Sequence, residues 1–335
     1  MRKIVIYLVT AVWTGIAVCG CELVSCGFAS ITEKEKTLSV ASWNVQTFFD
    51  SVSDGNEYSE FLSAKSKWSK EKYQKRVEKL CEIISLIDAD ILAFEEVEKE
   101  GLAYDIANHL DLQANRKKYY PYSCFACEEN GIFGNLVISR YPLKNMTLHN
   151  LEVRDDLAGT MPKLRPLLEV DVMTSEKEDA EKIFTLFVCH WKSKASDDGS
   201  SEIWRNYQES LLVQRMQNLK DEKFIACGDF NQDLKEFLYD ADDEGTKIIF
   251  RGSEKEYRVN SCWSVTSGEG SYFYDEQWEK IDHIFYSNKI LIENFSVINN
   301  GPHVTSDGKP FRYTVYSGEG YSDHFPIKCF VRCKL

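Results

Sequence analysis

The stretch "KFIACGDFNQD", residues 223–233, decides how the rest of this sequence is interpreted. It begins as a short apolar run, which is typical of a buried strand, and it ends in Asp229, Asn231 and Asp233. A chain whose formal net charge is already −13 has no general need for more acid at the tip of a buried strand. Loops at strand ends are where α/β folds assemble functional sites, so we expect this tip to belong to one.

Five more strand-like segments carry polar side chains at or near one end. The segments are short and rich in β-branched and aromatic residues, and they cover Thr37–Val45, Asp90–Val97, Ile183–Trp191, Ile281–Ser287 and His324–Cys333. Their polar residues are Asn44, Glu95, Glu96, His190, Asp282, His283, Ser322, Asp323 and His324. Each residue alone also fits a solvated strand end or a turn. If the ends converge, their carboxylate and amide oxygens suit Mg²⁺ or Mn²⁺ better than zinc.

Helical patterns lie between these strands. Apolar residues recur at spacings of four and three from Tyr73 to Ile87, which predicts an amphipathic helix over Ser69–Asp88 with Ser69 as its N-cap. A second amphipathic stretch covers Trp204–Leu219. Strands interleaved with helices indicate an α/β architecture built of packed layers.

The composition is that of a globular protein with one large domain or two small ones. The chain has 335 residues, 43% of them hydrophobic, which is enough for a sizeable core. Its 53 acidic residues outnumber its 40 basic ones, so no broad basic face for nucleic acid is indicated, although a local basic rim with bound metal would serve a nuclease. No linker or repeat divides the sequence, and we expect one catalytic domain over residues 37–335. Asp50–Lys70 and Ser196–Ile203 are interpreted as polar insertions.

Residues 1–26 form a separate export segment in this interpretation. Two basic residues precede an uncharged apolar stretch over residues 4–21, which is typical of a signal peptide, although its length also allows a membrane-spanning helix. The sequences "VCGC" and "LVSC" place Cys21 and Cys26 where a bacterial lipoprotein box has its lipidated cysteine. We expect an exported, lipid-anchored protein of the cell envelope; a secreted or membrane-anchored protein is the alternative, and the choice between the two cysteines stays open.

Eight cysteines lie outside that segment. Cys124 and Cys127 form a C-x-x-C pair, but no second pair follows at zinc-finger spacing. Cys189 and Cys227 lie inside apolar strands, where a free thiol behaves as a small hydrophobic group. We interpret the eight as buried thiols and leave the presence of one disulfide open.

The order of these motifs resembles the endonuclease/exonuclease/phosphatase superfamily, the deoxyribonuclease I-like metal-dependent phosphodiesterases. The likeness covers residues 37–335 and is carried by "SWNVQTF", "DADILAFEEVE", "GNLVISRYPL", "CHWKSK", "GDFN", "SYFYDEQWEKIDHIFYS" and "SDH". It implies a four-layered α/β sandwich, in which two mostly antiparallel β-sheets pack face to face with helices outside. Glu95 departs from the family, which often has Gln there.

The resemblance also implies roles for single residues. The implied ligands of Mg²⁺ or Mn²⁺ are Glu96, helped by Asn44 and Asp323. The implied catalytic residues are His190, Asp229, Asn231, Asp282 and His324, with Asp229 acting on the attacking water, Asn231 and both histidines contacting the phosphate, and Asp282 fixing the His324 ring. Arg165 resembles a family arginine that reaches phosphate, and Lys192 and Lys194 follow His190 where they would meet neighbouring phosphates.

The motifs indicate the chemistry better than the substrate. We expect a nuclease acting on DNA or RNA, because of the two lysines, a segment over Phe48–Phe61 similar to predicted bacterial exported nucleases, and aromatic residues near the site that could stack on bases, namely Trp191, Tyr272, Tyr274 and Trp278. The same rings would also serve as core or rim packing. A phosphatase or phospholipase acting on inositol polyphosphate or sphingomyelin is the alternative, and a non-catalytic surface binding protein is a further one. The expected partners are nucleic acid and, through the N-terminal segment, a membrane.

Overall fold

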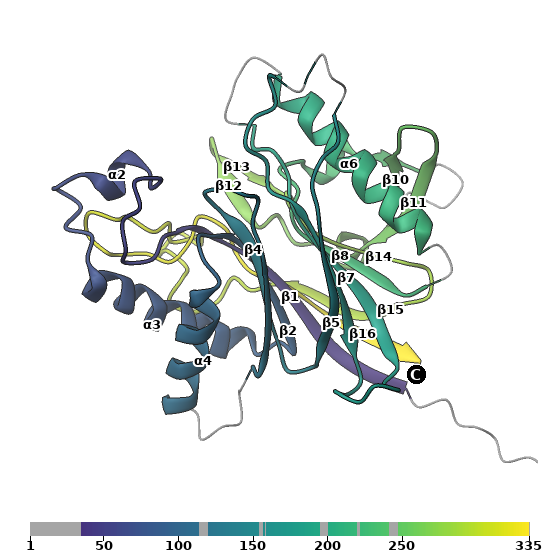
Figure 1. Cartoon of the computed structure of the whole chain (residues 1–335), viewed down its shortest axis with the longest axis horizontal. Helices are drawn as coiled ribbons and strands as arrows, with labels where there is room; N and C mark the ends of the chain where they lie inside the picture. The colour runs from purple at the N-terminus through teal and green to yellow at the C-terminus, as the bar shows by residue number, and fades with distance from the viewer. Residues whose placement is uncertain are drawn as a thin grey trace, which may run out of the picture. The chain divides into compact units, whose positions relative to one another are not determined.

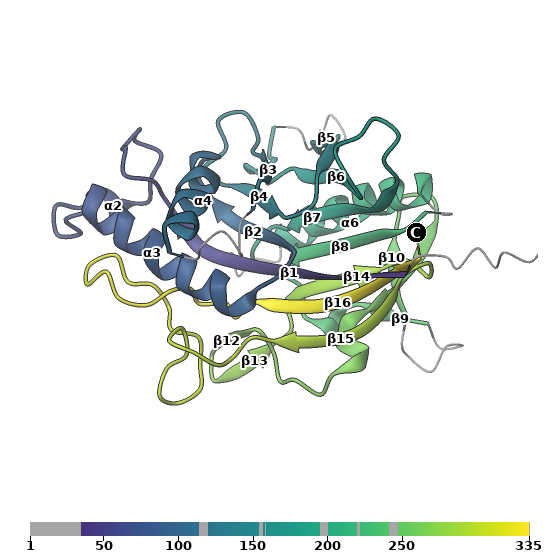
Figure 2. The ribbon, with the colours of Figure 1, turned by 90° about the horizontal axis from the view of Figure 1, so that it is seen from below.

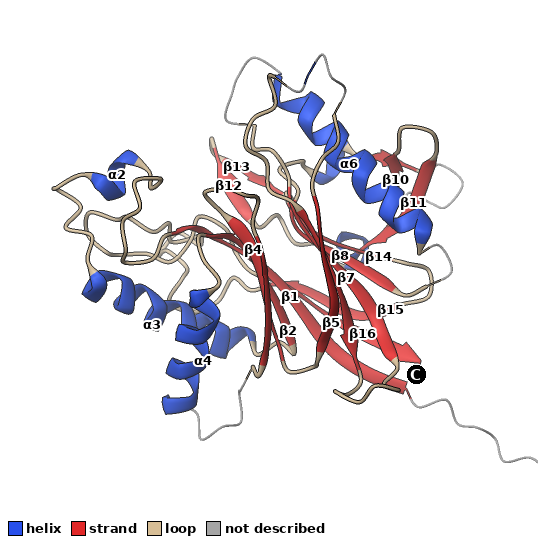
Figure 3. Ribbon diagram, viewed as in Figure 1, coloured by secondary structure: helices blue, strands red, loops and turns tan. Residues whose placement is uncertain are grey.

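In the computed structural model, two β-sheets pack face to face and helices cover the outer side of each (Figures 1 and 3). The structure describes residues 35–113, 120–153, 157, 159–194, 200–219, 222–240 and 247–334. Residues Lys36–Cys333 belong to one compact unit. The export segment, with Cys21 and Cys26, lies outside the described residues. Within the described ranges, none of the helices has the length and apolar character needed to cross a bilayer.

The first sheet has six strands and the second has eight. In spatial order the first contains β15 (Leu291–Val297), β16 (Ile327–Lys334), β1 (Glu35–Phe48), β2 (Ile91–Val97), β4 (Gly134–Ser139) and β3 (Tyr122–Ala126). The second contains β5 (Leu143–His149), β6 (Leu167–Met173), β7 (Lys182–His190), β8 (Phe224–Asp229), β14 (Asp282–Tyr286), β11 (Glu256–Ser261), β10 (Lys247–Arg251) and β9 (Leu238–Tyr239). A separate hairpin pairs β12 (Tyr272–Tyr274) with β13 (Gln277–Glu279).

Among the strand pairs whose register lies within the described residues, β1 with β2 and β7 with β8 are parallel, one pair in each sheet. The neighbouring pairs β2–β4, β6–β7 and β8–β14 are antiparallel. The carboxyl ends of paired parallel strands lie at the same edge of a sheet, so the polar residues at the ends of β1 and β2, and those at the ends of β7 and β8, are brought together in pairs.

The helices lie on the outer faces of both sheets. Those beside the first sheet are α3 (Lys70–Ile87) and α4 (Gly101–Gln113), and α6 (Ser200–Asn218) packs on the second. Shorter helical turns are α2 (Ser59–Leu62), η1 (Leu234–Glu236) and η3 (Cys262–Val265). The predicted four-layered sandwich with helices outside is therefore confirmed.

Strand alternation divides the apolar residues among three layers of core. In β1, Leu38 and Val40 pack between the sheets, whereas Ala41, Trp43 and Val45 pack against α3 and α4. The strands β7 and β8 divide their residues in the same way, between the inter-sheet core and the core beneath α6. A strand with apolar residues on both faces is buried on both, which explains why these segments read as continuous apolar runs.

Most predicted elements are confirmed, and several of their ends differ by a few residues. Ser69 is the N-cap of α3, and its hydroxyl accepts a hydrogen bond from the Lys72 amide. The helix α6 begins at Ser200, so residues 200–203 of the predicted insertion are helical, whereas residues 195–199 lie outside the described residues. The last strand begins at Ile327 rather than His324, because Pro326 has no amide hydrogen for a ladder. The eight cysteines are free thiols.

Candidate active site

The predicted catalytic residues of three neighbouring strands lie side by side. In the β7–β8–β14 ladder, His190 is opposite Asp229, and Asp229 is opposite Asp282. Residues two apart on a strand point the same way, so Asp229 shares the inner face with Cys227 and His190 shares it with Val188, both of which belong to the inter-sheet core. The polar residues therefore lie on the inner face of the sheet, at the edge of the apolar core between the two sheets.

Gly228 makes the close approach of β7 and β8 possible. Its φ is +136°, a conformation that side-chain-bearing residues rarely adopt. A Cβ atom at this position would lie 1.9 Å from the Cys189 carbonyl oxygen. The glycine of "CGDFN" is therefore required by the backbone spacing that places His190 opposite Asp229.

Bulges at the ends of β1 and β2 turn a further carboxylate into the same space. The register between these strands shifts after Asn44, and Gln46, Thr47 and Glu96 have φ of 51°, 47° and 62°. Such values cost about 1–3 kcal/mol each outside glycine and cluster at functional sites. The Thr47 amide donates to Glu96 Oε2 over 2.6 Å, and the Gln46 amide donates to Asn44 Oδ1 over 2.9 Å.

Asn44 links the two sheets at the centre of the cluster. Its Nδ2 donates to Asp229 Oδ2 over 3.0 Å and to Glu96 Oε1 over 3.3 Å. His190 Nε2 lies 3.8 Å from each of the same two carboxylate oxygens. Four predicted site residues, from β1, β2, β7 and β8, therefore surround one small volume.

His324 and Asp282 complete the cluster from the other side. His324 Nδ1 lies 2.9 Å from Asp282 Oδ2, which also accepts a 2.5 Å hydrogen bond from Ser271 Oγ. His324 Nε2 lies 4.0 Å from Asp229 Oδ2 and 4.0 Å from Asp323 Oδ1. The Asp282 carboxylate therefore orients the ring so that Nε2 faces the shared space.

Burial and neighbouring charges shift the pKa values of His324, His190 and Asp229 in different ways. Burial would lower the pKa of His324, but Asp282, Asp229 and Asp323 together raise it well above its usual value, so the ring stays cationic at neutral pH. Burial, reinforced by Arg165, lowers the pKa of His190 well below the usual value and keeps that ring neutral. Burial raises the pKa of Asp229 to about 7.

The predicted phosphate-binding residues lie to one side of His190. Arg165 and Lys192 both act electrostatically on His190, and Arg165 lines a small enclosed space with that histidine. The Lys194 ammonium is held by both oxygens of Glu236, at 2.7 and 2.8 Å. Asn231 has a φ of 47°. Its backbone N–H donates a hydrogen bond to Asp229 Oδ1 over 2.8 Å, and its side-chain Nδ2 donates to the Trp191 carbonyl oxygen.

The candidate aromatic residues divide into core and surface. Trp191 is buried against Phe230 and Trp278 stacks on Phe325, so both are packing residues. Tyr272 instead lies 4.6 Å from the His324 ring between centroids. Tyr274, which is 64% exposed, stacks in near-parallel orientation on Tyr272 at 6.2 Å.

His283 is a packing residue in this structure. It is buried among aromatic rings, and its Nε2 lies 2.9 Å from the Gln232 carbonyl. His303 lies in a loop but is buried, with Nε2 2.7 Å from the Ile298 carbonyl oxygen. Among the described residues, neither ring forms a hydrogen bond with a residue of the cluster.

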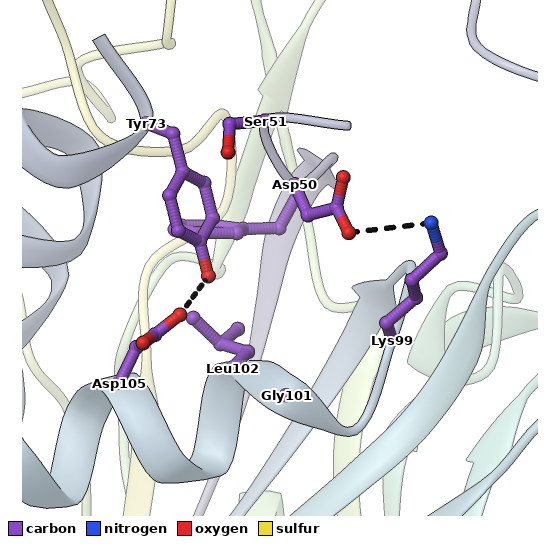
Figure 4. Close-up of a pocket in the computed structure, with 8 residues that line it drawn as sticks. Asp50, Ser51, Tyr73, Lys99, Gly101, Leu102 and Asp105 are labelled. Carbon is purple, nitrogen blue, oxygen red and sulfur yellow. Dashed lines mark hydrogen bonds and ion pairs between the residues drawn. The ribbon is translucent and has the colours of Figure 1, made fainter. Parts of the chain in front are cut away.

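A separate polar pocket of about 130 Å³ lies between α3, α4 and the segments that follow β1 and β2 (Figure 4). Figure 4 shows the Asp50–Lys99 ion pair and the hydrogen bond from the Tyr73 hydroxyl to Asp105. The ion pair has an N–O distance of 3.2 Å and the hydrogen bond a length of 2.5 Å. Lys99 also lies within 4 Å of Asp54 and Glu98. Because its charged groups already pair with one another, this pocket is a poor candidate for phosphate.

The donor set of the cluster fits a hard divalent cation. Asp229, Asp282 and His324 each offer a ligand atom within 4.8 Å of the others, but Asp282 and His324 are engaged with each other. The Glu96 side chain is 18% exposed and faces the same space. Carboxylate and amide oxygens are the ligands that Mg²⁺ and Mn²⁺ prefer. Glu96, Asn44 and Asp323 are the residues that would hold such a cation, with Asp229 beside them.

Two supporting residues were not predicted from the sequence. Ser271 donates to Asp282, and its only signal was the family-like segment "SYFYDEQWEKIDHIFYS" in which it stands. Asn135, in "GNLVIS", is fully buried and its Nδ2 donates to the carbonyls of Pro166 and Val188, which ties β4 to the second sheet. A buried Asn within an apolar strand is a signal that could have been followed.

Two packed sheets with this cluster at the ends of their strands define a protein of the deoxyribonuclease I-like class. The chain belongs to the endonuclease/exonuclease/phosphatase family, whose model matches residues 39–333. Members of this family are hydrolases that act on phosphoester bonds. A search of curated protein sequences finds no match.

Solved structures share the fold at low sequence identity. An endonuclease/exonuclease/phosphatase family protein from Bacteroides thetaiotaomicron has 16% identity and a TM-score of 0.57, over 90% of this chain and 100% of its own. A mannosyl-6-phosphatase from the same organism has 16% identity and a TM-score of 0.55, over 88% and 99%. TDP2 from Caenorhabditis elegans has 14% identity and a TM-score of 0.54, over 88% and 74%. These likenesses concern the fold alone.

Proposed function

We propose that this chain is a divalent-metal-dependent phosphodiesterase that hydrolyses phosphodiester bonds of DNA or RNA. The observation that supports this most strongly is the continuous set of contacts from Asn44 and Glu96, through Asp229, to the His324–Asp282 pair. Oxygen ligands for a hard cation, a carboxylate that titrates near neutrality and a cationic imidazole thus lie in one buried cluster. Phosphoester hydrolysis uses all three.

Each residue of the cluster has its own role in the proposed reaction. A bound cation would polarise a phosphoryl oxygen. Asp229 orients the attacking water and takes its proton, for which a pKa near the operating pH is favourable. His324, kept cationic by Asp282, donates to phosphate oxygens as negative charge develops on them. Neutral His190 donates to the same anion through Nε2.

Tyr272 and Tyr274 support a nucleic-acid substrate. They form a short ladder of stacked rings that leads from His324 to solvent, on the hairpin of β12 and β13. A base attached to the scissile phosphate would find an exposed ring face on Tyr274, and aromatic stacking accepts every base. Arg165 and Lys192 would contact the phosphate groups on the other side.

A second candidate function is hydrolysis of a small phosphate ester, such as a sugar or inositol phosphate. Lys194 is paired with Glu236, and Arg312 lies 3.9 Å from Asp323, so these two cations are already compensated by acids. Fewer cations remain for a long polyanion than the sequence alone indicated. A compact substrate with one or two phosphates needs no more than Arg165 and Lys192.

One panel of substrates tests these alternatives. The purified protein is incubated with Mg²⁺, Mn²⁺ or EDTA and with plasmid DNA, RNA, sphingomyelin, an inositol polyphosphate or mannose 6-phosphate. We expect metal-dependent cleavage of nucleic acid, and a loss of about 10²- to 10⁴-fold in Asp229→Asn and His324→Gln. Cleavage of a monoester without cleavage of nucleic acid would establish the second candidate, and unchanged rates in both variants would refute the assigned roles.

We further propose that residues 1–26 export the protein and that Cys21 or Cys26 carries lipid. The basic start, the apolar stretch and the two lipoprotein-like boxes support this. Mass spectrometry of the mature N-terminus from a bacterial host would show a lipidated cysteine and identify which of the two it is. An intact Met1 in the mature protein would contradict export with cleavage.

A further inference from the structure

Arg76 is a buried cation on α3 whose hydrogen bonds, among the described residues, reach no predicted site residue, although Glu96 and Asp323 act on its charge. Its side chain is almost fully buried, with the residue 2% exposed, and burial lowers the pKa of its guanidinium to about 10, so it remains charged at neutral pH. The guanidinium lies between two rings, 4.4 Å from the centre of Phe48 and 3.8 Å from that of Tyr313. A charge this deeply buried is costly unless its donors are used.

The two Nη groups of Arg76 donate to three consecutive carbonyls at the end of β1, whereas the buried Nε has no hydrogen-bond partner among the described residues. Nη1 donates to the Thr47 carbonyl over 2.9 Å, and Nη2 donates to the Val45 carbonyl over 3.1 Å and to the Gln46 carbonyl. Carbonyls of successive residues in an extended strand alternate in direction, so they converge on one cation only if the strand is distorted. The positive φ values of Gln46 and Thr47 are that distortion.

The same distortion directs two amide groups into the active site. With their carbonyls turned toward Arg76, Gln46 and Thr47 present their N–H groups to Asn44 Oδ1 and Glu96 Oε2. Successive N–H groups in such a turn form a small cradle for anionic oxygen. These bonds orient Glu96 and Asn44, the two predicted ligands that also bond to each other.

We propose that Arg76 is the positioning residue of the cation-binding end of the active site, acting through the backbone of β1. The inference rests on the proposed function in so far as Glu96 and Asn44 bind a divalent cation. The Gln46 side chain reinforces the arrangement, because it exchanges two hydrogen bonds with the backbone of Tyr313, whose ring covers the guanidinium.

Lys72 provides a matched control on the same helix. Its ammonium donates to the carbonyls of Ser66, Val315 and Tyr316, over 2.6 to 3.0 Å, and so holds the segment between β15 and β16 that passes beside α3 in Figure 2. It therefore performs the same kind of carbonyl capping one turn away from Arg76 without touching the end of β1.

The test measures Mn²⁺ binding by calorimetry in the wild type, Arg76→Lys, Arg76→Ala and Lys72→Met, with circular dichroism to verify folding. We expect Arg76→Lys to weaken Mn²⁺ binding about 10- to 100-fold, as loss of a group that orients ligands does. Lys72→Met should bind Mn²⁺ as the wild type does. Guanidinium ion at low, non-denaturing concentration should restore binding to Arg76→Ala, and wild-type affinity in folded Arg76 variants would overturn the proposal.

Amide hydrogen exchange in the metal-free protein separates this inference from the proposed function. The Thr47 amide should be protected in the wild type and in Lys72→Met, and should exchange faster in Arg76→Lys. If the wild type binds no Mn²⁺ but shows this pattern, Arg76 positions Glu96 and the proposed metal chemistry is wrong. If Thr47 stays protected in Arg76→Lys, the positioning role is wrong whatever the metal does.

Discussion

Asp282 Oδ2 lies 2.9 Å from His324 Nδ1, although 42 residues separate the two in the chain. The contact spans from the first residue of β14 to the segment that precedes β16. Asp282 is the strongest of the charges that raise the pKa of His324. Asp282 therefore contributes most among the three carboxylates that keep the imidazole charged.

Replacing Asp282 with Asn should make the activity depend on pH in a new way. The wild-type pKa of His324 is raised, so its ring is charged through neutral pH. Without Asp282 the proton is lost at lower pH, and the deficit in kcat/KM should be small at acidic pH and grow to about 10²- to 10⁴-fold at alkaline pH. Ser271→Ala, which removes only the hydroxyl donor to Asp282, is the control, and a wild-type pH profile in Asp282→Asn would contradict the assignment.

Glu95 and Glu96 are adjacent but should respond oppositely to replacement by Gln. Glu95 is fully buried with one unpartnered carboxyl oxygen, and burial raises its pKa well above the usual value, so the folded state holds it protonated. The unfolded chain ionises it, so wild-type stability from this group falls as pH rises above about 4.3. Glu95→Gln should therefore be more stable than the wild type at pH 8, with the difference shrinking toward pH 4.

Glu96→Gln should instead lose cation binding while it keeps the stability of the wild type. Urea denaturation at several pH values measures the stability of Glu95→Gln, and calorimetric Mn²⁺ titration measures cation binding by Glu96→Gln. Loss of Mn²⁺ binding in Glu95→Gln together with normal binding in Glu96→Gln would reverse the roles of the two residues.

His283 should make the fold sensitive to acid. Burial lowers its pKa to about 4, whereas the unfolded chain protonates it near 6.5. The unfolded state therefore binds the proton first, and stability is lost as pH falls from about 6.5 to about 4, by up to about 3 kcal/mol for this group. His283→Phe, which suits the surrounding rings, should remove that part of the pH dependence in urea denaturation curves. An unchanged difference in stability between pH 8 and pH 4.5 would show that His283 is not its cause.

Removing the Tyr274 ring should weaken activity on nucleotides and spare simpler esters. Stacking on an aromatic side chain contributes about 1–3 kcal/mol per base, so Tyr274→Ala should lower kcat/KM for a nucleotide ester roughly 10-fold or more. Hydrolysis of a phosphodiester without a base should be unaffected, and Tyr274→Trp should retain activity. Tyr104→Ala, which alters a ring 71% exposed on α4, is the control. Equal losses on both substrates would argue against base stacking.

The inner-face position of most site residues could be predicted from the sequence by counting. Asn44 is four residues beyond Val40, and Asp229 is two beyond Cys227, so each shares a face with a residue of the inter-sheet core. The polar tips were recognisable because they interrupt apolar runs. What the sequence could not show is which strands are neighbours, since strand order depends on contacts between distant segments.

Glu96 shows where counting fails. Alternation from Leu92 and Phe94 would point it toward the helices, with Glu95 on the inner face. The positive φ of Glu96 and the bulge in β2 turn its carboxylate back to Asn44 and His190. The role of Arg76 could not be predicted for a related reason. Arg76 binds backbone carbonyl groups, and no residue type in the sequence indicates such a contact.

Gly228 has a consequence for directed evolution of this enzyme. Because the Cys189 carbonyl occupies the place of its Cβ, any substitution would push apart the strands that carry His190 and Asp229. A randomised library should therefore recover only wild type at this codon, whatever ester is selected for. Mutations that change the substrate preference should instead occur in the surface hairpin of β12 and β13 and in the loops. These segments can vary while the catalytic residues stay the same.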